Sequence, residues 1–274
     1  MRLSTFLPLL SLSGSALSYP SRAYSEKNGH GIDNTQAPIF IPDSPDALAI
    51  DNNDDPSLLG LPSWRTTHLL ARRLLALSTT GVLSTVYAGP QPRHPSLAGV
   101  PIGLPDYIAD CANSDPHLTT LIGPGNPLIL ALNIGTTFRN TKAGSNISLA
   151  LDWWNQKQDA KVSLASLPRV SLLGTLERLP EDELDASTRL ALEECFLKSH
   201  PDAKYWLPDD KGAAHSGYWA RLVVQEALWI GGFGDRARIG WLDVEEWSAV
   251  REHGEDGEEG WADVRLPGEC PRKL

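Results

Sequence analysis

The chain has 274 residues, a formal net charge of −10 at pH 7 and three cysteines. This acidity argues against a general nucleic-acid-binding or anionic-membrane-binding role, because such partners attract basic surfaces. No segment has the run of ~20 apolar residues that a membrane span needs. Cys111, Cys195 and Cys270 allow at most one intramolecular disulfide, so a hydrophobic core has to hold the fold.

The first 63 residues are predicted to precede the folded domain. Arg2 is followed by a short apolar run and by small residues that end at Ser18, the pattern of a secretory signal peptide covering residues 1–18. Residues 19–63 are rich in Asn, Asp, Pro, Ser and Gly and are expected to be a disordered leader or propeptide. We therefore expect a secreted or vacuolar protein. The alternative is a disordered N-terminus on a cytosolic protein.

The folded domain is predicted to begin with an amphipathic helix at Trp64. In WRTTHLLARRLLALS the leucines recur at helical spacing. Arg65, Arg72 and Arg73 are predicted to lie on the opposite, solvated face of this helix.

Strands dominate the rest of the domain. A second helix is predicted from Glu181 to Ser199, where acidic residues favour a helix start, and a short third one over VEEWSAV after Asp243. The fold class that follows is α+β, mainly β, with a closed barrel and peripheral helices in a domain over residues 64–250, followed by an acidic C-terminal tail over residues 251–274. The predicted strands are Gly81–Ala88, Val100–Ala112, Pro127–Ile134, Ser148–Trp154, Arg169–Leu179, Trp219–Trp229 and Arg238–Trp241.

The sixth of these strands leads into a glycine turn. Trp219–Trp229 shows a rough two-residue alternation of apolar and polar side chains. Gly231, Gly232 and Gly234 are predicted to allow positive φ angles and close backbone approach, so that the chain can reverse.

Familiar catalytic motifs are missing from the sequence. The histidines and cysteines do not fall at zinc-site spacings, and no dinucleotide fingerprint, phosphate loop or GxSxG nucleophile elbow is present. Pairs of carboxylates exist, but the sequence does not place any two of them across a cleft.

The polar connector between the third and fourth strands is the one candidate ligand site. Thr136, Thr137, Arg139 and Lys142 offer hydroxyl and cationic donors within one turn-forming stretch, a composition that suits a phosphate. Solvated loop side chains are the alternative interpretation. Asn146 begins the only N-x-[ST] sequon and would accept a glycan in a secreted protein.

Three segments carry a family resemblance: CFLKSHPDAKYWLP at Cys195–Pro208, WIGGFG at Trp229–Gly234 and GSNISLALDW at Gly144–Trp153. With them the chain resembles the CREG-like branch of the pyridoxamine-5′-phosphate-oxidase-like, FMN-binding split barrels, and it looks most similar to secreted fungal members. The resemblance implies a six-stranded split β-barrel, a homodimer, and in flavin-binding relatives an FMN held between subunits with basic residues where Arg139 and Lys142 stand.

The chain also departs from the flavin-binding pattern. Flavin-binding relatives carry a further basic pair on an earlier strand, and residues 99–110 here contain no Arg or Lys. We therefore expect no tightly bound cofactor and a secreted or vacuolar glycoprotein that acts as a non-catalytic scaffold for an unidentified protein or small molecule. One alternative is an FMN-dependent oxidoreductase. Another is a haem protein with His200 or His215 as the axial ligand.

Overall fold

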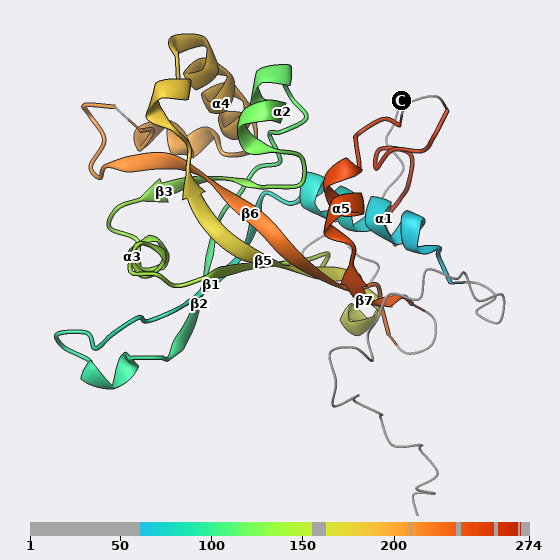
Figure 1. Cartoon of the computed structure of the whole chain (residues 1–274), viewed down its shortest axis with the longest axis horizontal. Coiled ribbons are helices and arrows are strands. Elements are labelled where there is room, and N and C mark those ends of the chain that lie inside the picture. Colours follow the sequence, from blue (N-terminus) through green and yellow to red (C-terminus); the bar gives the residue numbers. More distant parts are fainter. Residues whose placement is uncertain are drawn as a thin grey trace, which may run out of the picture. The chain divides into compact units, whose positions relative to one another are not determined.

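The computed structural model describes residues 61–154, 163–208, 210–233, 237–254, 257–267 and 269. The predicted signal peptide, residues 19–60 of the predicted leader, Gly234 and Cys270 lie outside these residues. The helices and strands in chain order (Figure 1) are α1 (Trp64–Leu77), β1 (Thr80–Val86), β2 (Pro101–Tyr107), α2 (Pro116–Ile122), β3 (Leu128–Leu132), α3 (Thr136–Lys142), β4 (Ile147–Asp152), β5 (Arg169–Arg178), α4 (Ala186–Ser199), the 3₁₀ turn η5 (Pro201–Tyr205), β6 (Gly217–Ile230), β7 (Ile239–Leu242) and α5 (Val244–Ala249).

The strands form one antiparallel sheet that curls into a barrel. Its strand order is β2-β1-β4-β5-β6-β3, and the short β7 adds to β6. The two ends of this order meet where Ala109, just after β2, bridges Leu128 at the start of β3 through backbone hydrogen bonds of 3.0 and 2.8 Å. The predicted split β-barrel of mainly β class is therefore confirmed. The second predicted strand is shorter than expected, because β2 ends at Tyr107.

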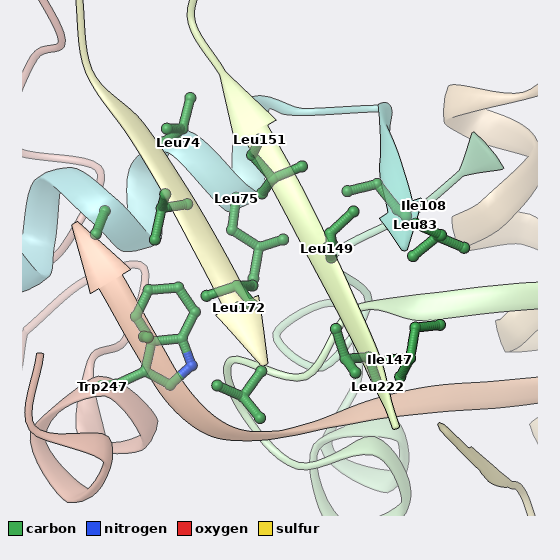
Figure 2. Close-up of a cluster of buried hydrophobic side chains, with 14 of the residues drawn as sticks. Leu74, Leu75, Leu83, Ile108, Ile147, Leu149, Leu151, Leu172, Leu222 and Trp247 are labelled. Carbon is green, nitrogen blue, oxygen red and sulfur yellow. The ribbon is translucent and has the colours of Figure 1, made fainter. Parts of the chain in front are cut away.

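The main core lies inside the barrel and is closed at one end by helices. Alternate residues of the strands point inward, and Leu74 and Leu75 of α1 with Trp247 of α5 pack against them (Figure 2). All three side chains are at most 1% exposed. The leucines of α1 therefore form the apolar helix face that the sequence predicts, and this face covers one end of the barrel core.

A second core lies on the outer side of β3, under α2 and α4. Ile129 and Ala131 face the barrel interior, whereas Leu128 and Leu130 join the second core together with Trp219 of β6. β3 is buried on both faces, and this explains why its sequence is a continuous apolar run rather than an alternation.

A β-bulge in β6 explains the irregular alternation of that strand. Glu226 pairs with Leu173 and Val224 pairs with Gly174, so Gln225 has no partner in the register. The extra residue shifts the inward-facing set by one position. Gly174 is required opposite the bulge, because a Cβ there would lie 1.8 Å from the carbonyl oxygen of Val223.

The glycine turn after β6 depends on space rather than on backbone angle. Gly231 and Gly232 do not have positive φ, which corrects that part of the prediction. Instead, a Cβ on Gly231 would lie 2.7 Å from Nε1 of Trp229, and one on Gly232 would lie 3.0 Å from the carbonyl oxygen of Ser166. Close approach of neighbouring groups is what these two positions need.

The prediction for the basic face of α1 is wrong for two of its three arginines. Arg72 and Arg73 are 0% and 1% exposed, whereas Arg65 is on the surface. Arg72 Nη2 donates to Asp110 Oδ2 at 3.2 Å, and its guanidinium lies 5.0 Å from the ring centroid of Trp247. Three polar atoms of the pair, Arg72 Nε and Nη1 and Asp110 Oδ1, are buried without a hydrogen-bond partner among the described residues.

Arg73 is buried because the segment after α5 folds back over α1. Its Nε donates to Glu269 Oε2 at 2.7 Å, and its Nη1 donates to the carbonyl oxygen of Trp261 at 3.1 Å. Trp261 and Leu266 are themselves buried, at 7% and 2% exposure. Helical periodicity does not reveal these partners, because Trp261 and Glu269 lie 188 and 196 positions further along the chain.

The helix predicted to begin at Glu181 begins later. Residues 181–183 form a separate 3₁₀ turn, and α4 begins at Ala186 with Asp185 as its N-cap. The Asp185 side chain accepts a hydrogen bond from the backbone N–H of Thr188 at 2.8 Å, and this bond, together with those from the Ser187 and Thr188 side chains, lowers its pKa to about 2. Among the described residues, no helix is both long and apolar enough to cross a membrane.

Candidate functional site

The four residues predicted to bind phosphate all lie on α3, but the structure divides them. Thr137 is buried at 3% exposure and Thr136 is half-buried, whereas Arg139 and Lys142 are exposed. Neither cation forms an ion pair with a described residue. The structure therefore brings Arg139 and Lys142 to the surface of the helix and separates Thr137 from them.

The packing of α3 explains this division. Asn140 is buried, and its Nδ2 donates to Thr85 Oγ1 on β1 at 3.0 Å, while Phe138 is 5% exposed. These residues face the barrel together with Thr137. Positions 139 and 142 are one turn apart and point away from the packed side.

A groove on the barrel surface lies next to the predicted glycosylation site. It has a volume of about 430 Å³ and is lined by β1, β2, β4, β5, β6 and the exposed Asn146. Of the residues that line it, only Glu226 is charged, and neither Arg139 nor Lys142 contributes. The groove therefore lacks a cation from the described chain.

A second polar cavity, between α1 and α5, has a volume of about 410 Å³ and mixed charges. Arg65 on its wall is paired with Glu258 at 2.7 Å. The buried His68 bridges the two helices, with Nδ1 2.8 Å from the Trp64 carbonyl oxygen and Nε2 3.2 Å from that of Asp243. The cavity also contains Glu246, whose Oε2 lies 3.3 Å from Nδ1 of His68.

A third cavity, which we name the Asp106 cavity, lies where the end of β2 meets β3, α3 and η5. Its volume is about 280 Å³. One carboxylate stands among apolar and aromatic side chains, and no Arg or Lys contributes to the wall. The lining residues are Pro105, Asp106, Tyr107, Leu130, Leu132, Ile134, Gly135, Phe138 and Trp206.

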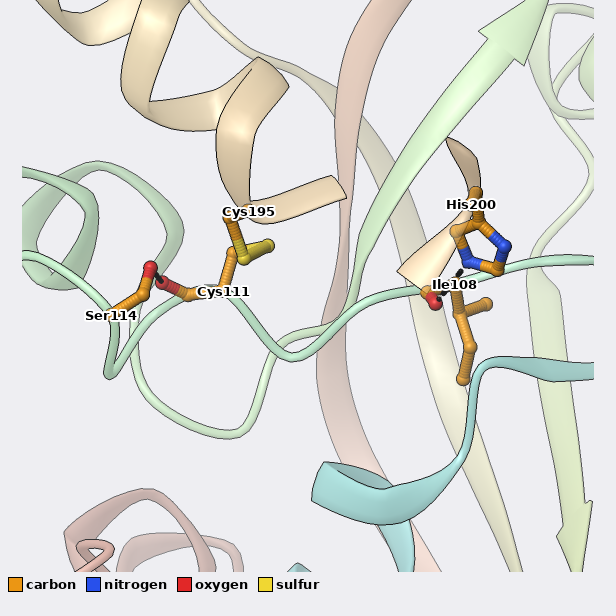
Figure 3. The surroundings of a disulfide bond; sticks show 5 residues. All are labelled: Ile108, Cys111, Ser114, Cys195 and His200. Atoms are coloured by element: carbon orange, nitrogen blue, oxygen red, sulfur yellow. Dashed lines mark hydrogen bonds between the residues drawn. A yellow bond between two sulfur atoms is a disulfide. The ribbon is translucent and has the colours of Figure 1, made fainter. Parts of the chain in front are cut away.

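The segment Cys195–Pro208 contributes Trp206 to the wall of this cavity and is anchored at two points. Cys195 near the end of α4 forms a disulfide with Cys111 (Figure 3), which selects one of the pairings left open by the cysteine count. His200 is 4% exposed, and its Nε2 donates to the carbonyl oxygen of Ile108 at 2.9 Å. Trp206 follows η5 and lines the cavity.

Aromatic stacking joins this segment to β2. The rings of Tyr107 and His200 are stacked with centroids 4.2 Å apart. The ring of Phe196 also contacts His200, with a centroid distance of 4.7 Å. The hydroxyl of Tyr107 donates to Asp202 Oδ2 at 2.8 Å. The orientation of Tyr107 is thereby fixed from two directions.

The structure places both histidines that were considered as axial haem ligands, His200 and His215. One ring nitrogen of His200 is engaged with a backbone carbonyl, and the ring is packed between aromatic side chains, so His200 has a structural role here. His215 is exposed and lines none of the three cavities. In the described part of the chain, no three His, Cys, Asp or Glu side chains are grouped to hold a metal ion.

The pKa values of two residues in the Asp106 cavity are shifted. Burial raises the pKa of Asp106, while the hydrogen bond from the Tyr107 N–H and the charge of His200 act in the opposite direction. The hydrogen bond to Asp202 raises the pKa of Tyr107. Perturbed acids inside cavities mark candidate functional sites.

Residues 62–249 match the family described as CREG, beta-barrel, which is more than half of the chain. The chain belongs to the CREG β-barrel family. This confirms the resemblance drawn from the three sequence segments. No curated protein matches the chain.

Several solved structures resemble this CREG-family protein. A haem binding protein from Mycobacterium smegmatis has 22% identity and a TM-score of 0.46, with 67% of this chain and 61% of that chain covered. A protein of unknown function from Agrobacterium tumefaciens has 23% identity and a TM-score of 0.42, with coverages of 61% and 57%. HutZ, the haem storage protein from Vibrio cholerae, has 15% identity and a TM-score of 0.39, with coverages of 60% and 94%.

Sequence reasoning missed the residues of the Asp106 cavity. Asp106 and Tyr107 lie in the stretch that stood out only for its lack of Arg and Lys, and Trp206 lies in one of the family segments. The one local signal was an acid beside an aromatic residue at the end of a strand. Their convergence depends on contacts between residues about a hundred positions apart, which the CREG-family sequence does not display locally.

Proposed function

We propose that this CREG-family protein is a secreted or vacuolar glycoprotein that acts as a non-catalytic binding scaffold and does not hold FMN tightly. The observation that carries the proposal is the charge of the two described cavities near α3: no Arg or Lys lines the groove beside Asn146 or the Asp106 cavity. The one charged side chain on each wall, Glu226 or Asp106, would repel a phosphate dianion. Arg139 and Lys142, the two cations predicted to bind it, do not line the groove.

The energetic consequence is large. Each charge-assisted hydrogen bond contributes roughly 1.5–3 kcal/mol, so the absence from residues 99–110 of the basic pair that flavin-binding relatives carry weakens a phosphate ligand by about two to four powers of ten. The two buried arginines of α1 are engaged within the chain, Arg72 with Asp110 and Arg73 with Glu269. These groups serve the stability of the barrel.

Two observations support the secretory pathway. The Cys111–Cys195 disulfide joins residues 84 positions apart, and such bonds persist in oxidising compartments and are rare in the cytosol. Asn146 of the sequon is exposed on the turn before β4, where a glycosylating enzyme can reach it.

The proposal is tested with protein made through a eukaryotic secretory route and titrated with FMN to tens of micromolar while flavin fluorescence is followed. We expect no saturable change and no flavin absorbance in the purified protein. Stoichiometric yellow FMN in the preparation would overturn the proposal and favour an FMN-dependent oxidoreductase. In that case Arg139→Gln and Lys142→Gln should weaken FMN binding.

A charge-reversal variant tests the physical reason directly. Glu226→Lys replaces the repelling carboxylate of the groove with a cation and should raise FMN affinity at least tenfold. Glu194→Lys makes the same change on the exposed surface of α4 and should leave FMN affinity at the wild-type level. Equal behaviour of the two variants would show that the groove charge does not control flavin binding.

Secretion and glycosylation are tested on the full chain with its own N-terminus. We expect the protein in the medium or the vacuole of a eukaryotic host, with a mass that falls after endoglycosidase treatment. Asn146→Gln should remove this mass difference. Retention in the cytosol without a glycan would contradict the proposed compartment.

We further propose that the protein is a homodimer. The outer face of the sheet around β1 and β4 exposes Val82, Val86 and Ala150. The neighbouring strand β2 of the same chain adds Pro101 and Pro105 to this face. An exposed apolar sheet face of this kind is typical of an interface. Sedimentation should show a dimer that Val82→Arg disrupts, whereas Leu190→Arg, a matched change at an exposed leucine of α4, leaves it intact. A monomeric wild type would contradict this part.

A further inference from the structure

The Asp106 cavity combines one negative charge with an apolar wall. Three of its side chains are aromatic and three are aliphatic, and Asp106 is the only charged residue among those that line it. Its volume of about 280 Å³ is close to the lower end of the range for small-molecule sites, about 300–1,000 Å³. Charge complementarity therefore favours a small cationic ligand, and the apolar wall favours a cation with an apolar body.

The carboxylate of Asp106 has capacity left for such a ligand. One oxygen, Oδ1, accepts the N–H of Tyr107 at 2.8 Å. No described Arg, Lys or His forms an ion pair with Asp106. His200 at the end of α4 acts on Asp106 only through its charge. An acid without an ion-pair partner in a half-buried site is unfavourable for folding, and such groups are concentrated at functional sites.

The aromatic wall is already in place without a ligand. Tyr107 is held by stacking on His200 and by its hydrogen bond to Asp202. Phe138 lies against Gly135, where a Cβ would be 2.7 Å from the ring atom Cδ2, so glycine lets the ring pack close to the turn. Pre-organised walls reduce the entropy that binding costs.

We propose that the Asp106 cavity binds a small organic amine with an apolar or aromatic body, in which the ammonium group pairs with Asp106 and the body contacts Phe138 and Trp206. Aromatic faces attract cations, and a carboxylate beside them fixes the orientation of the ammonium group. The proposed site is separate from the groove beside Asn146. It stands whether or not the protein binds FMN.

The test is a titration of the glycosylated full-length protein with phenethylamine, its trimethylammonium analogue, phenethyl alcohol and phenylacetate, followed by ligand-observed NMR and calorimetry. We expect saturable binding of the two cations and at least tenfold weaker binding of the neutral alcohol and the acid. Equal affinity for phenethylamine and phenethyl alcohol would overturn the proposal, as would the failure of both cations to bind. Addition of FMN to tens of micromolar should leave amine binding unchanged.

Asp106→Asn is the decisive variant, because it removes the charge and keeps an oxygen for the Tyr107 N–H. It should weaken phenethylamine binding at least tenfold without lowering the melting temperature at neutral pH. Asp182→Asn, at an exposed acid outside the cavity, should bind the amine like the wild type. An unchanged affinity in Asp106→Asn would show that the carboxylate does not recognise the ligand.

A pH titration of the wild type gives an independent readout. The groups that face Asp106 are Tyr107 beside it, with Asp202 on the Tyr107 hydroxyl, and His200 from α4, while β3 and α3 contribute apolar residues only. Protonation of Asp106 should abolish amine binding as the pH falls through its raised pKa. The weaker binding of phenethyl alcohol should not change over the same range, and a parallel loss for both ligands would contradict recognition by charge.

Discussion

Tyr107 lies flat against His200, with ring centroids 4.2 Å apart and ring planes 6° from parallel. This contact joins the end of β2 to the end of α4, two elements about ninety residues apart in the chain. The disulfide between Cys111 and Cys195 joins the same two regions by a covalent bond (Figure 3). Together they hold the wall of the Asp106 cavity.

Removal of the His200 ring should destabilise the fold. His200→Ala loses the hydrogen bond to Ile108 and the packing of two aromatic rings, and we expect the free energy of unfolding to fall by about 2–4 kcal/mol. His215→Ala, at an exposed histidine, should change it by less than about 0.5 kcal/mol. Denaturant unfolding measures both variants, and a similar small effect for each would contradict the structural role of His200.

The β-bulge in β6 should make Gly174 intolerant of any side chain. Gly174→Ala places a methyl group 1.8 Å from the backbone oxygen of Val223, and we expect a loss of more than about 4 kcal/mol or a protein that does not fold. Gly89→Ala is the matched control, because no atom lies within 4 Å of the added Cβ there. Soluble yield and urea midpoint report the difference, and a fully stable Gly174→Ala would show that the bulge is not formed.

The buried Arg72–Asp110 pair should be costly to break and easy to replace. Arg72→Met leaves the Asp110 carboxylate buried without its cation and should cost about 3–5 kcal/mol. The double variant Arg72→Met/Asp110→Leu removes both charges and should recover most of this loss. A double-mutant cycle measured by denaturant unfolding checks the expectation, and additive losses in the double variant would contradict it.

Glu269 should make stability depend on pH. Burial acts to raise its pKa, but the hydrogen bonds from Arg73 and from the Leu266 N–H, together with the charge of Arg73, lower it overall below the ordinary value of 4.5. A lowered carboxyl pKa in the folded state adds stability that is present above the unfolded-state pKa and is lost as the pH falls through the folded-state value.

Glu269→Gln should therefore melt at a lower temperature than the wild type at neutral pH. The difference should shrink toward zero once the pH falls below the folded-state pKa of Glu269. Melting temperatures recorded between about pH 7 and about pH 3 show whether this happens. A constant difference across that range would mean that the Arg73–Glu269 pair does not cause it.

Local patterns were sufficient for the elements of the barrel. The leucine spacing of α1, the continuous apolar run of β3 and the alternation in β4 each depend on residues within one element, and each predicted element is present in the structure. The three family segments were likewise readable along the chain, and the match over residues 62–249 confirms what they indicated.

Only the tertiary structure determined which charged side chains of α1 are buried. Helical periodicity placed Arg72 and Arg73 on a solvated face, yet both are buried because Asp110, Trp247 and the segment up to Glu269 cover them. A charge can be buried only where a partner from another part of the chain pairs with it, and the local sequence pattern does not identify that partner. The Asp106 cavity exists for the same reason, since β2, β3, α3 and η5 meet there only when the barrel has closed.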